Sequence, residues 1–366
     1  MKFVPTFARI REAMAKKKVM LITGSQGLIG SEASLYFGNK GYEIHGIDNN
    51  MRKFFFGDKG DTSWNLKRLK DGIPNFVHHD IDIRDRMKIF SLLKENPPEA
   101  IIHCAAQPSH DWAKKDPLLD FEVNAVGTHI LLEATRTYSP EAPFVFMSTN
   151  KVYGDSPNYL PLEEKATRWE YSKPEHFDGI DETQSIDGSK HSIFGASKVA
   201  ADVMVQEYGK YFGMNTVSFR GGCLTGPQHS GVELHGFLSY LIKVAVSGGM
   251  YTIFGYKGKQ VRDQIHSYDV VRAFEEFIAN PKQGVVYNLG GGRGNSMSIL
   301  ETFDKIKSIT GKTVNSVYDE KNREGDHICY ISNLKKLKTD YPDWGITKKL
   351  DNIMEEMIDA EASRLV

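Results

Sequence analysis

Residues 19–30 read Val-Met-Leu-Ile-Thr-Gly-Ser-Gln-Gly-Leu-Ile-Gly, an apolar run followed by glycines at positions 24, 27 and 30. The apolar run predicts a buried strand from Val19 to Thr23, and the residues after the last glycine show a helical pattern. Glycine allows a tight turn and a close approach of the backbone to a neighbouring group. The stretch therefore predicts a strand, a turn and a helix that open a βαβ unit.

From Lys18 onward, short β-branched and apolar runs alternate with amphipathic stretches. This alternation is typical of βαβ units that build a parallel sheet covered on both faces, an α/β fold of the doubly wound Rossmann type. We expect the strands at 19–23, 43–47, 75–78, 100–104, 144–148 and 216–219, with 285–289 closing the sheet.

Asp48 ends the second expected strand, where a carboxylate would accept hydrogen bonds from both hydroxyls of an adenosine ribose. The amides that follow the glycines can bind a pyrophosphate. Together these features predict a bound dinucleotide, NAD in preference to NADP because a carboxylate repels a ribose phosphate; Arg52 argues the other way. The alternative is a helix-packing turn beside a solvated aspartate.

Several further motifs follow this turn in a fixed order: Asp82-Ile83, His103-Cys-Ala-Ala-Gln107, Asn124, Ser148-Thr-Asn-Lys-Val-Tyr-Gly154 and Lys198. With the glycine turn, their order and spacing resemble the extended short-chain dehydrogenase/reductase superfamily over nearly the whole chain. The resemblance implies that NAD is bound. The residues expected to hold it are Gly24, Gln26, Gly27, Leu28, Ile29, Gly30, Asp48, Asn49, Asp82, Ile83, Ala105, Ala106, Gln107, Asn124 and Lys198.

In the superfamily, residues at the positions of Asp82 and Ile83 flank the adenine, and Lys198 would bond the nicotinamide ribose. Asn124 would bind the backbone around the active site. From the residues alone two other interpretations stay open. Asp82 could cap the helix that begins near Asp85, and Asn124 could cap its own helix.

The expected chemical site combines Thr149 with Phe194 and Lys198. Thr149 takes the place of the superfamily's catalytic Ser/Thr, which binds the reacting sugar oxygen. The four-residue spacing puts Phe194 and Lys198 on one helix face. There the superfamily has a tyrosine whose pKa the lysine lowers, so that a phenolate takes a proton.

Phenylalanine cannot serve as that acid or base, and three explanations compete. Phe194 is a natural replacement whose proton transfer passes to another group, an inactivating substitution, or a mark of a protein that binds without turnover. We favour the first, because Thr149, Lys198 and the glycine turn are intact. The candidate substitutes are Tyr153, His191, Lys151 and Cys223.

Two arginine elements predict a diphosphate clamp, since a planar guanidinium suits phosphate oxygens. Residues 255–269 and 322–326 resemble the elements with which nucleotide-sugar epimerases and dehydratases hold their donor, which places Arg262 and Arg323 on phosphate and Asp326 on a ribose. Either arginine alone could be a surface ion pair. The expected substrate-binding residues are Thr149, Asn150, Lys151, Cys223, Arg262, Arg323 and Asp326.

Within the superfamily, the stretch 148–155, the insert with Ala166-Thr-Arg-Trp, Gly179-Ile-Asp-Glu-Thr183 and residues 258–263 look most like the CDP-tyvelose (CDP-paratose) 2-epimerase family. The resemblance departs at Phe194 and at residues 220–226. Gly231 to Gly236 is expected in the sugar or base pocket, although Glu233 and His235 could be polar loop residues. The expected substrate is a CDP-sugar, with UDP-, GDP- and dTDP-sugars as alternatives.

We therefore expect an NAD-dependent nucleotide-sugar epimerase that passes through a transient ketone, at carbon 2 for a 2-epimerase. A dehydratase or dehydrogenase of the same fold is the first alternative, disfavoured as a dehydratase because no Asp-Glu pair follows Thr149. A catalytically silent sugar-nucleotide binder is the second. Paired helices on one sheet face, as in relatives, predict a homodimer.

The domain boundaries follow from these motifs. An extension at 1–17 precedes an NAD-binding domain at 18–220, to which 264–294 return, and residues 221–263 and 295–366 form a smaller, interleaved substrate lobe. The extension is expected to form a short amphipathic helix that packs on the body or a subunit in preference to a membrane surface. The long segment between Tyr153 and Phe194 is equally well explained as a surface excursion or as a lid over the substrate.

The composition excludes several other classes of partner. With 366 residues, 40% of them hydrophobic, the chain can bury a large core, and its net charge of -1 gives no field that recruits nucleic acid or an anionic membrane. No apolar run reaches membrane-spanning length. The three cysteines, Cys104, Cys223 and Cys329, are too few and scattered for a disulfide framework or a metal site, so we expect no metal and a cytoplasmic protein.

Overall fold

The computed structural model describes residues 18–232, 236–323 and 325–364. Its central feature is one seven-stranded sheet in the order β12-β8-β5-β4-β1-β2-β3, in which every pairing is parallel. The strands are β1 (Val19–Thr23), β2 (Glu43–Ile47), β3 (Phe76–His79), β4 (Ala100–His103), β5 (Phe144–Thr149), β8 (Thr216–Gly221) and β12 (Val285–Leu289). All seven expected strands exist, with ends that differ by no more than two residues, and the predicted fold class is confirmed.

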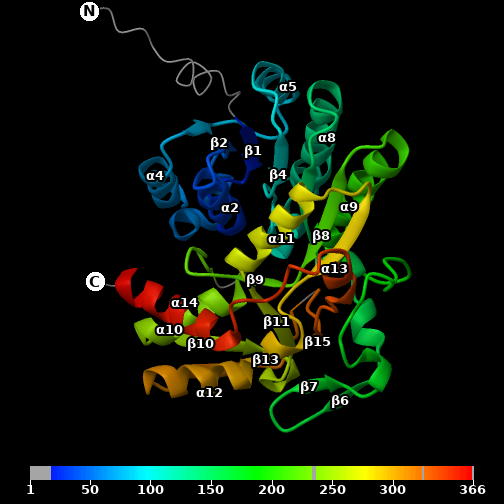
Figure 1. Cartoon of the computed structure of the whole chain (residues 1–366). Helices are drawn as coiled ribbons and strands as arrows, with labels where there is room; N and C mark the ends of the chain where they lie inside the picture. The colour runs from blue at the N-terminus through cyan, green and yellow to red at the C-terminus, as the bar shows by residue number, and fades with distance from the viewer. Residues whose placement is uncertain (1–17, 233–235, 324, 365–366) are drawn as a thin grey trace, which may run out of the picture.

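Helices cover both faces of this sheet, as its strands, apolar on both sides, require. One buried apolar cluster joins the sheet to α2 (Leu28–Gly38), α4 (Ser63–Gly72) and α11 (Ser267–Ala279). A second cluster joins the opposite face to α5 (Arg86–Glu95), α8 (Gly127–Tyr138) and α9 (Ser192–Phe212). Figure 1 shows the resulting three layers in its upper half.

The strand order reverses beside β1, which pairs with β2 on one side and β4 on the other. The chain leaves β1 outward to β2 and β3 and then returns to β4. Loops on the two sides of such a switch point diverge and leave a crevice beyond the carboxyl ends of the strands. This topology decides where a ligand can bind.

A second lobe lies below the sheet in Figure 1. Its apolar cluster is built from α10 (Phe237–Ser247), α12 (Ile299–Thr310) and α14 (Leu350–Arg364). Its strands are β9 (Cys223–Thr225), β10 (Met250–Phe254), β11 (Val261–His266), β13 (Ser296–Ser298), β14 (Asn315–Asp319) and β15 (Cys329–Tyr330). Since β11 ends at His266 and pairs with β9, the chain returns to the first lobe at α11, three residues after the expected boundary at 264.

The remaining elements are short. They include the helices α3 (Met51–Phe56), α6 (His110–Lys115), α7 (Pro117–Phe121) and α13 (Lys335–Asp340), a π-helical turn η2 (Glu122–Val126), the strands β6 (Leu162–Glu164) and β7 (Trp169–Tyr171), and several 3-10 turns. The first residues, 1–17, for which an amphipathic helix was expected, lie outside the described residues. Within the described ranges, no helix is long and apolar enough to cross a bilayer.

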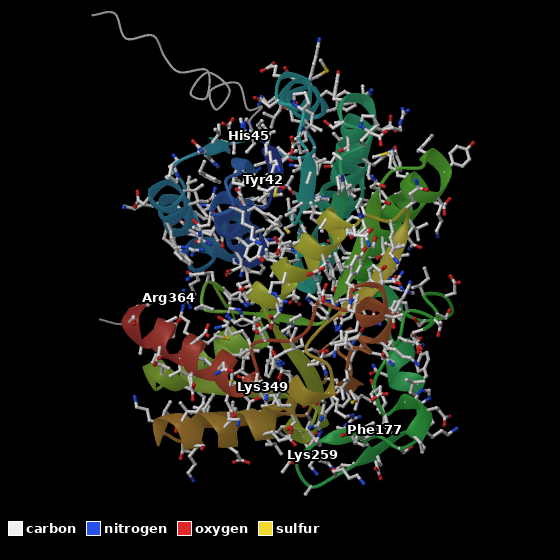
Figure 2. The ribbon with its side chains drawn as sticks, in the orientation of Figure 1. Tyr42, His45, Phe177, Lys259, Lys349 and Arg364 are labelled. Carbon is white, nitrogen blue, oxygen red and sulfur yellow. The ribbon has the colours of Figure 1, made fainter. Side chains whose placement is uncertain are left out.

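The excursion between Tyr153 and Phe194 packs on the second lobe. It contains the β6–β7 hairpin, and the amide of Trp169 donates to the carbonyl of Lys259 at 2.8 Å. Arg293 forms an ion pair with Glu170 at 2.8 Å. Figure 2 shows Phe177 and Lys259 together at the lower end of the molecule, far from Tyr42 and His45 on the first lobe.

A buried charge network ties α9 to the sheet. Arg220 on β8 donates to both carboxylate oxygens of Asp202 on α9, at 2.9 and 3.2 Å, and Ser148 on β5 donates to the same carboxylate at 2.6 Å. Arg220 also donates to the hydroxyl of Tyr153, which donates to Asn288 on β12. Buried ions are tolerated when every polar group is paired in this way.

Removing one partner of this network would leave an uncompensated charge in the core. We expect Arg220→Leu to lower the free energy of unfolding by about 3–5 kcal/mol, measured by chemical denaturation. Lys67→Ala serves as the control, because the Lys67–Asp71 pair is exposed on α4 and such pairs contribute about 0.3–0.5 kcal/mol. Equal losses in the two variants would contradict a structural role for the buried pair.

Candidate active site

A cavity of about 480 Å³ runs from the switch point of the sheet into the second lobe. It brings together 21 of the residues that the sequence predicted for the site. These are Gly24, Gln26, Gly27, Leu28, Ile29, Gly30, Asp48, Asn49, Asp82, Ile83, Ala105, Ala106, Thr149, Asn150, Lys151, Phe194, Lys198, Cys223, Arg262, Arg323 and Asp326. Gln107, Asn124 and Tyr153 are not among the lining residues.

The glycine turn forms the floor of the cavity at the start of α2. Gly24 has a φ of +67°, and a Cβ on it would lie 2.7 Å from the amide nitrogen of Ala105. A Cβ on Gly30 would lie 2.1 Å from the carbonyl oxygen of Gly24. The turn therefore needs glycine for both its conformation and its packing, and it leaves the first amides of an eleven-residue helix facing the cavity.

Asp48 stands beside this turn at the end of β2. Its carboxylate accepts hydrogen bonds from the amides of Gln26 and Asn50, at 2.9 and 2.8 Å. Burial raises the pKa of Asp48 despite these two bonds. The side-chain oxygen of Gln26, also at the cavity wall, is buried without a hydrogen-bond partner. This end of the cavity thus presents an acceptor carboxylate and an unmatched acceptor oxygen, which suit hydroxyl groups of a ligand.

Asp82 and Ile83 form the wall on the other side of β2. Asp82 accepts from the amide and guanidinium of Arg84, at 2.7 to 3.0 Å. The helix that follows, α5, is capped by Asp85, which accepts from the amide of Lys88. The alternative in which Asp82 caps that helix is therefore wrong.

Lys198 on α9 reaches the cavity beside β5. Its ammonium group donates to the carbonyl of Met147 at 3.0 Å and lies 4.2 Å from the centre of the Phe146 ring. Burial lowers the pKa of Lys198 to about 8, although the charges of Asp202 and Asp120 oppose this change. The lysine is thus held against the carboxyl-terminal part of β5, where it lines the cavity.

Thr149 ends β5 at the same end of the cavity. Its hydroxyl oxygen accepts from the amide of Lys151 at 3.3 Å, which orients the side chain at the start of a 3-10 turn, η3 (Asn150–Tyr153). Lys151 donates to the carbonyl of Gly325 at 2.8 Å, and burial lowers its pKa to about 8. Cys223 lines the wall nearby, and burial raises the pKa of its thiol to about 11.

Phe194 lies on the first turn of α9, as its spacing from Lys198 predicted, and only 7% of it is exposed. Its ring meets the imidazole of His110 edge to face, with ring centres 4.9 Å apart. His110 also lines the cavity, and its Nδ1 lies 2.9 Å from the hydroxyl oxygen of Ser192. Sequence reasoning missed this histidine.

The second-lobe end of the cavity carries the predicted arginines. Arg262 on β11 is buried and pairs with Asp326, and both line the wall with Arg323. Although burial opposes ionisation, the charges of Arg262 and Lys151 hold the pKa of Asp326 below its ordinary range. The interpretation of Arg262 as a surface ion pair is wrong, because the pair lies inside the cavity.

Two of the four proposed substitute bases do not reach the cavity. Tyr153 is fully buried in the Arg220 network, and burial raises its pKa to about 12. The ring nitrogens of His191 lie 2.9 Å from the carbonyls of Ser189 and Val152. Both side chains form hydrogen bonds behind the cavity wall, so Tyr153, which the sequence placed among the catalytic residues, does not line the cavity in the structure.

Gln107 and Asn124 also lie behind the wall. The amide nitrogen of Asn124 donates to the carbonyl of Gln107 and to Ser197 on α9, and its oxygen accepts from the amide of Gln107. The Gln107 side chain donates to Asp120 at 2.7 Å. Asn124 thus binds the backbone around the site, as the resemblance implied; it lies within the π-turn η2 and does not cap its helix.

The sequence profile of the NAD-dependent epimerase/dehydratase family matches residues 20–290 of this chain. The chain belongs to that family. The prediction of NAD as cofactor is confirmed by this membership, as is the predicted superfamily. The matched range begins at the second residue of β1 and stops one residue after β12, so it includes all seven strands of the parallel sheet except Val19.

Individual relatives of the epimerase/dehydratase family agree with this assignment. The CDP-paratose 2-epimerase of Salmonella typhi is 32% identical over 94% of this chain and 99% of that protein. The dTDP-glucose 4,6-dehydratase of Shigella flexneri is 28% identical over 80% of this chain and 78% of that protein.

Among solved structures, the UDP-glucose 4-epimerase of Thermotoga maritima superposes with a TM-score of 0.76 at 24% identity, covering 95% of this chain and 99% of that chain. The NAD complex of the Thermus thermophilus UDP-glucose 4-epimerase gives 0.74 at 24% identity, covering 94% and 98%. These two likenesses support the fold.

Several residues that line the cavity of this chain belong to no motif that the sequence analysis identified. They include His110, Gln228, His229, Tyr240, Phe254 and Gln260. His110 follows the Ala105–Gln107 segment by three residues, at the carboxyl end of a parallel strand, and that position was the one available signal. Glu233 and His235, expected near the pocket, lie outside the described residues. In the described ranges, no group of three metal-ligating side chains is present.

The glycine turn gives a direct test of the cofactor end. We expect Gly30→Ala to weaken NAD binding about tenfold to a hundredfold, because the new methyl group would overlap the Gly24 carbonyl and displace α2 at a cost of about 1–3 kcal/mol. Calorimetric titration with NAD measures the change. Gly294→Ala, where a Cβ would meet nothing within 4 Å, is the matched control. Unchanged affinity in Gly30→Ala would contradict the cofactor site.

Proposed function

We propose that this protein is an NAD-dependent epimerase that inverts a hydroxyl-bearing carbon of a nucleoside-diphosphate sugar through a transient ketone. One observation carries the proposal: a single cavity is lined by the glycine turn, by two arginines of the second lobe, and by Thr149 and Lys198. The family's chemistry needs these three parts to meet in one space.

The cofactor end fits a dinucleotide by its shape and its donors. The amides after Gly24 would hold the pyrophosphate, and Asp48 would accept from the adenosine ribose. Asp82 and Ile83 would flank the adenine, and Ala105 and Ala106 would line the path to the nicotinamide. A dinucleotide held by these residues would supply a nicotinamide ring able to take up a hydride and give it back.

The second-lobe end fits the diphosphate of the donor. Arg262 would bind phosphate oxygens through its planar fork, and Arg323 would add a second cation. Asp326 would orient the Arg262 guanidinium and accept from the nucleotide ribose. Holding the nucleotide through its charged phosphates leaves the sugar free to reorient, which an epimerase requires for return of the hydride to the opposite face.

At the reacting carbon, the Thr149 hydroxyl would donate to the sugar oxygen that becomes the ketone. Asn150, Lys151 and Cys223 would line the sugar site beside it. Lys198, fixed on the Met147 carbonyl, would bond the nicotinamide ribose and keep its positive charge near the reacting oxygen. The net redox change over one turnover is zero.

The identity of the sugar rests on the relatives. The similarity to the Salmonella typhi CDP-paratose 2-epimerase, which extends over 94% of this chain, favours carbon 2 and a CDP-linked sugar over UDP-, GDP- or dTDP-linked sugars. The 4,6-dehydratase alternative is supported by the similarity to the Shigella flexneri enzyme. It is disfavoured because Asn150 and Lys151, and no Asp-Glu pair, follow Thr149.

We further propose a cytoplasmic homodimer that forms through α8 and α9. Both helices lie on the same face of the sheet, and Val203, Tyr211 and Phe212 on α9 are exposed apolar residues. A shared helical face of this kind would bury them between two copies of the chain.

Ligand release and product analysis test the function. We expect mass spectrometry of the denatured protein to detect NAD, and incubation with CDP-sugars to invert carbon 2 without incorporation of deuterium from heavy water at that carbon. A hydride held on the cofactor does not exchange with solvent, whereas a 4,6-dehydratase would take up deuterium at carbon 5, which loses a proton when water is eliminated and regains one from solvent. A 4-keto-6-deoxy product would instead establish the alternative, and turnover of no nucleotide sugar would leave the silent binder.

Thr149 allows a narrower test. Thr149→Val keeps the shape of the side chain but removes its hydroxyl, and we expect kcat to fall about a hundredfold to a thousandfold with NAD affinity unchanged. Thr149→Ser, which keeps a donor, should retain most of the activity. Steady-state kinetics on the active CDP-sugar measure both variants, and equal losses would contradict a role for the hydroxyl.

A further inference from the structure

The stretch of chain that carries Arg262 presents a row of three polar side chains to the cavity. Gln260, Arg262 and Gln264 line it, whereas the residues between them are not among the lining residues. Successive side chains of an extended chain point to opposite faces, so these three share one face, with neighbours about 6–7 Å apart. The arginine that the proposed function places on phosphate therefore has a glutamine on each side.

The pairing of β11 shows which glutamine lies toward the reacting end. Gln264 pairs with Cys223 on β9, which follows the end of β8 by two residues, and β8 ends beside Thr149. Gln260 lies at the other end of the row, against β10 of the second lobe. With the sugar at Thr149 and the diphosphate at Arg262, the nucleoside would extend past the arginine toward Gln260.

The side-chain amide of Gln260 has one matched end and one unmatched end. Its Nε2 donates to the carbonyl of Phe254, at the end of β10, at 3.1 Å. Its Oε1 is buried and has no hydrogen-bond partner in the described parts of the chain. A flipped amide would set this oxygen against the Phe254 carbonyl, so the contact leaves the oxygen as the atom for a ligand. Since an unmatched buried acceptor costs free energy, the site suits a ligand that brings a donor.

The cavity wall on this side is otherwise mostly apolar. It is lined from β10, from α10 and from the start of α12 by Phe254, Tyr251, Leu238 and Ile299. Three of these residues belong to the buried apolar cluster of the second lobe. Aromatic and aliphatic walls with a single placed polar group are typical of sites that bind a flat ring. A nucleobase has that shape and carries its donors and acceptors on its edge.

Among the pyrimidine bases, cytosine supplies the matching donor. Its amino group at carbon 4 donates, whereas uracil and thymine carry an acceptor oxygen at that position. An oxygen placed against Oε1 of Gln260 would leave both acceptors unmatched. The ring N–H of uracil and thymine is one ring atom away from that position.

We propose that Gln260 selects the base of the substrate by accepting a hydrogen bond at Oε1 from the amino group of cytosine. The inference rests on the proposed function, because it takes a nucleoside diphosphate to be bound at Arg262. It gives a physical reason for a CDP-linked sugar that does not depend on likeness to relatives. The side-chain oxygen of Gln264 is unmatched as well, but it lies at the sugar end of the row.

Binding of free nucleotides to the full chain with NAD tests base selection without turnover. We expect calorimetric titration to give CDP an affinity about tenfold to a hundredfold above that of UDP and dTDP, because these leave the buried acceptor unmatched. The pyrimidin-2-one analogue of CDP, which lacks the amino group, should bind as weakly as UDP. GDP and ADP, whose amino groups are on larger two-ring bases, complete the panel.

Gln260→Leu removes the acceptor from the protein. We expect it to bind CDP about tenfold to a hundredfold more weakly than the native chain, and to bind CDP and the analogue equally. Loss of the Phe254 contact alone would weaken all nucleotides alike, so the ratio of the two affinities is the readout. If Gln260→Leu does not fold, the analogue still tests the amino group on the native chain.

Gln283→Leu is the matched control. Gln283 also donates to a backbone carbonyl, that of Gly213 at 2.9 Å, but it is exposed and is not among the residues that line the cavity. We expect this variant to keep every nucleotide affinity within about twofold of the native value.

Each other outcome has a definite meaning. Equal native affinities for CDP and its analogue, or tighter binding of any nucleotide other than CDP, would overturn base selection by Gln260 and leave the epimerase in place. A preference for CDP that persists unchanged in Gln260→Leu would assign recognition to another residue and overturn it as well. A native chain that binds none of these nucleotides would instead contradict the proposed function.

Discussion

The contact between Gly30 and the carbonyl of Gly24 is the constraint on which the site depends. With no side chain at position 30, α2 starts directly against the turn that leaves β1, and Gly24 in turn packs on the backbone of Ala105 after β4. The turn after β1, the start of α2 and the segment after β4 are thereby packed against one another through their backbones. The walls of the cavity diverge from this point, and every lining residue from Asp48 to Lys198 is placed relative to it.

Charge is distributed unevenly around that frame. On α9, Asp202 belongs to a fully paired network with Arg220 and Tyr153, whereas Lys198 donates to the Met147 carbonyl, lies over the Phe146 ring and lines the cavity. The paired network keeps the helix in position, and the ammonium group stays available to a ligand. Lys198 and Asp202 lie four residues apart on one face of α9, so the carboxylate that anchors the helix also supplies a negative charge near the ammonium group.

The sequence predicted the elements well because local patterns determine them. Apolar runs located the seven strands, and the glycines located the turn, since both follow from short-range sterics and burial. The side-chain directions were harder to predict. Tyr153 turns inward because of Asn288, which is 135 residues away, and Gln107 turns inward because of Asp120 and Asn124. His110 was missed because only the fold brings it to Phe194.

The path of the chain between the lobes has its own consequence. It leaves the sheet after β8, returns at α11, leaves again after β12 and returns once more at α13, whose Leu337 belongs to the apolar cluster of the sheet, before α14 joins the second lobe. Each lobe is therefore assembled from separate stretches of sequence. A hinge that opened the two lobes would have to bend the backbone at all of these crossings at once. Ligand exchange must then rely on movement of individual loops, and no single cut in the chain would yield a fragment that contains one whole lobe and nothing of the other.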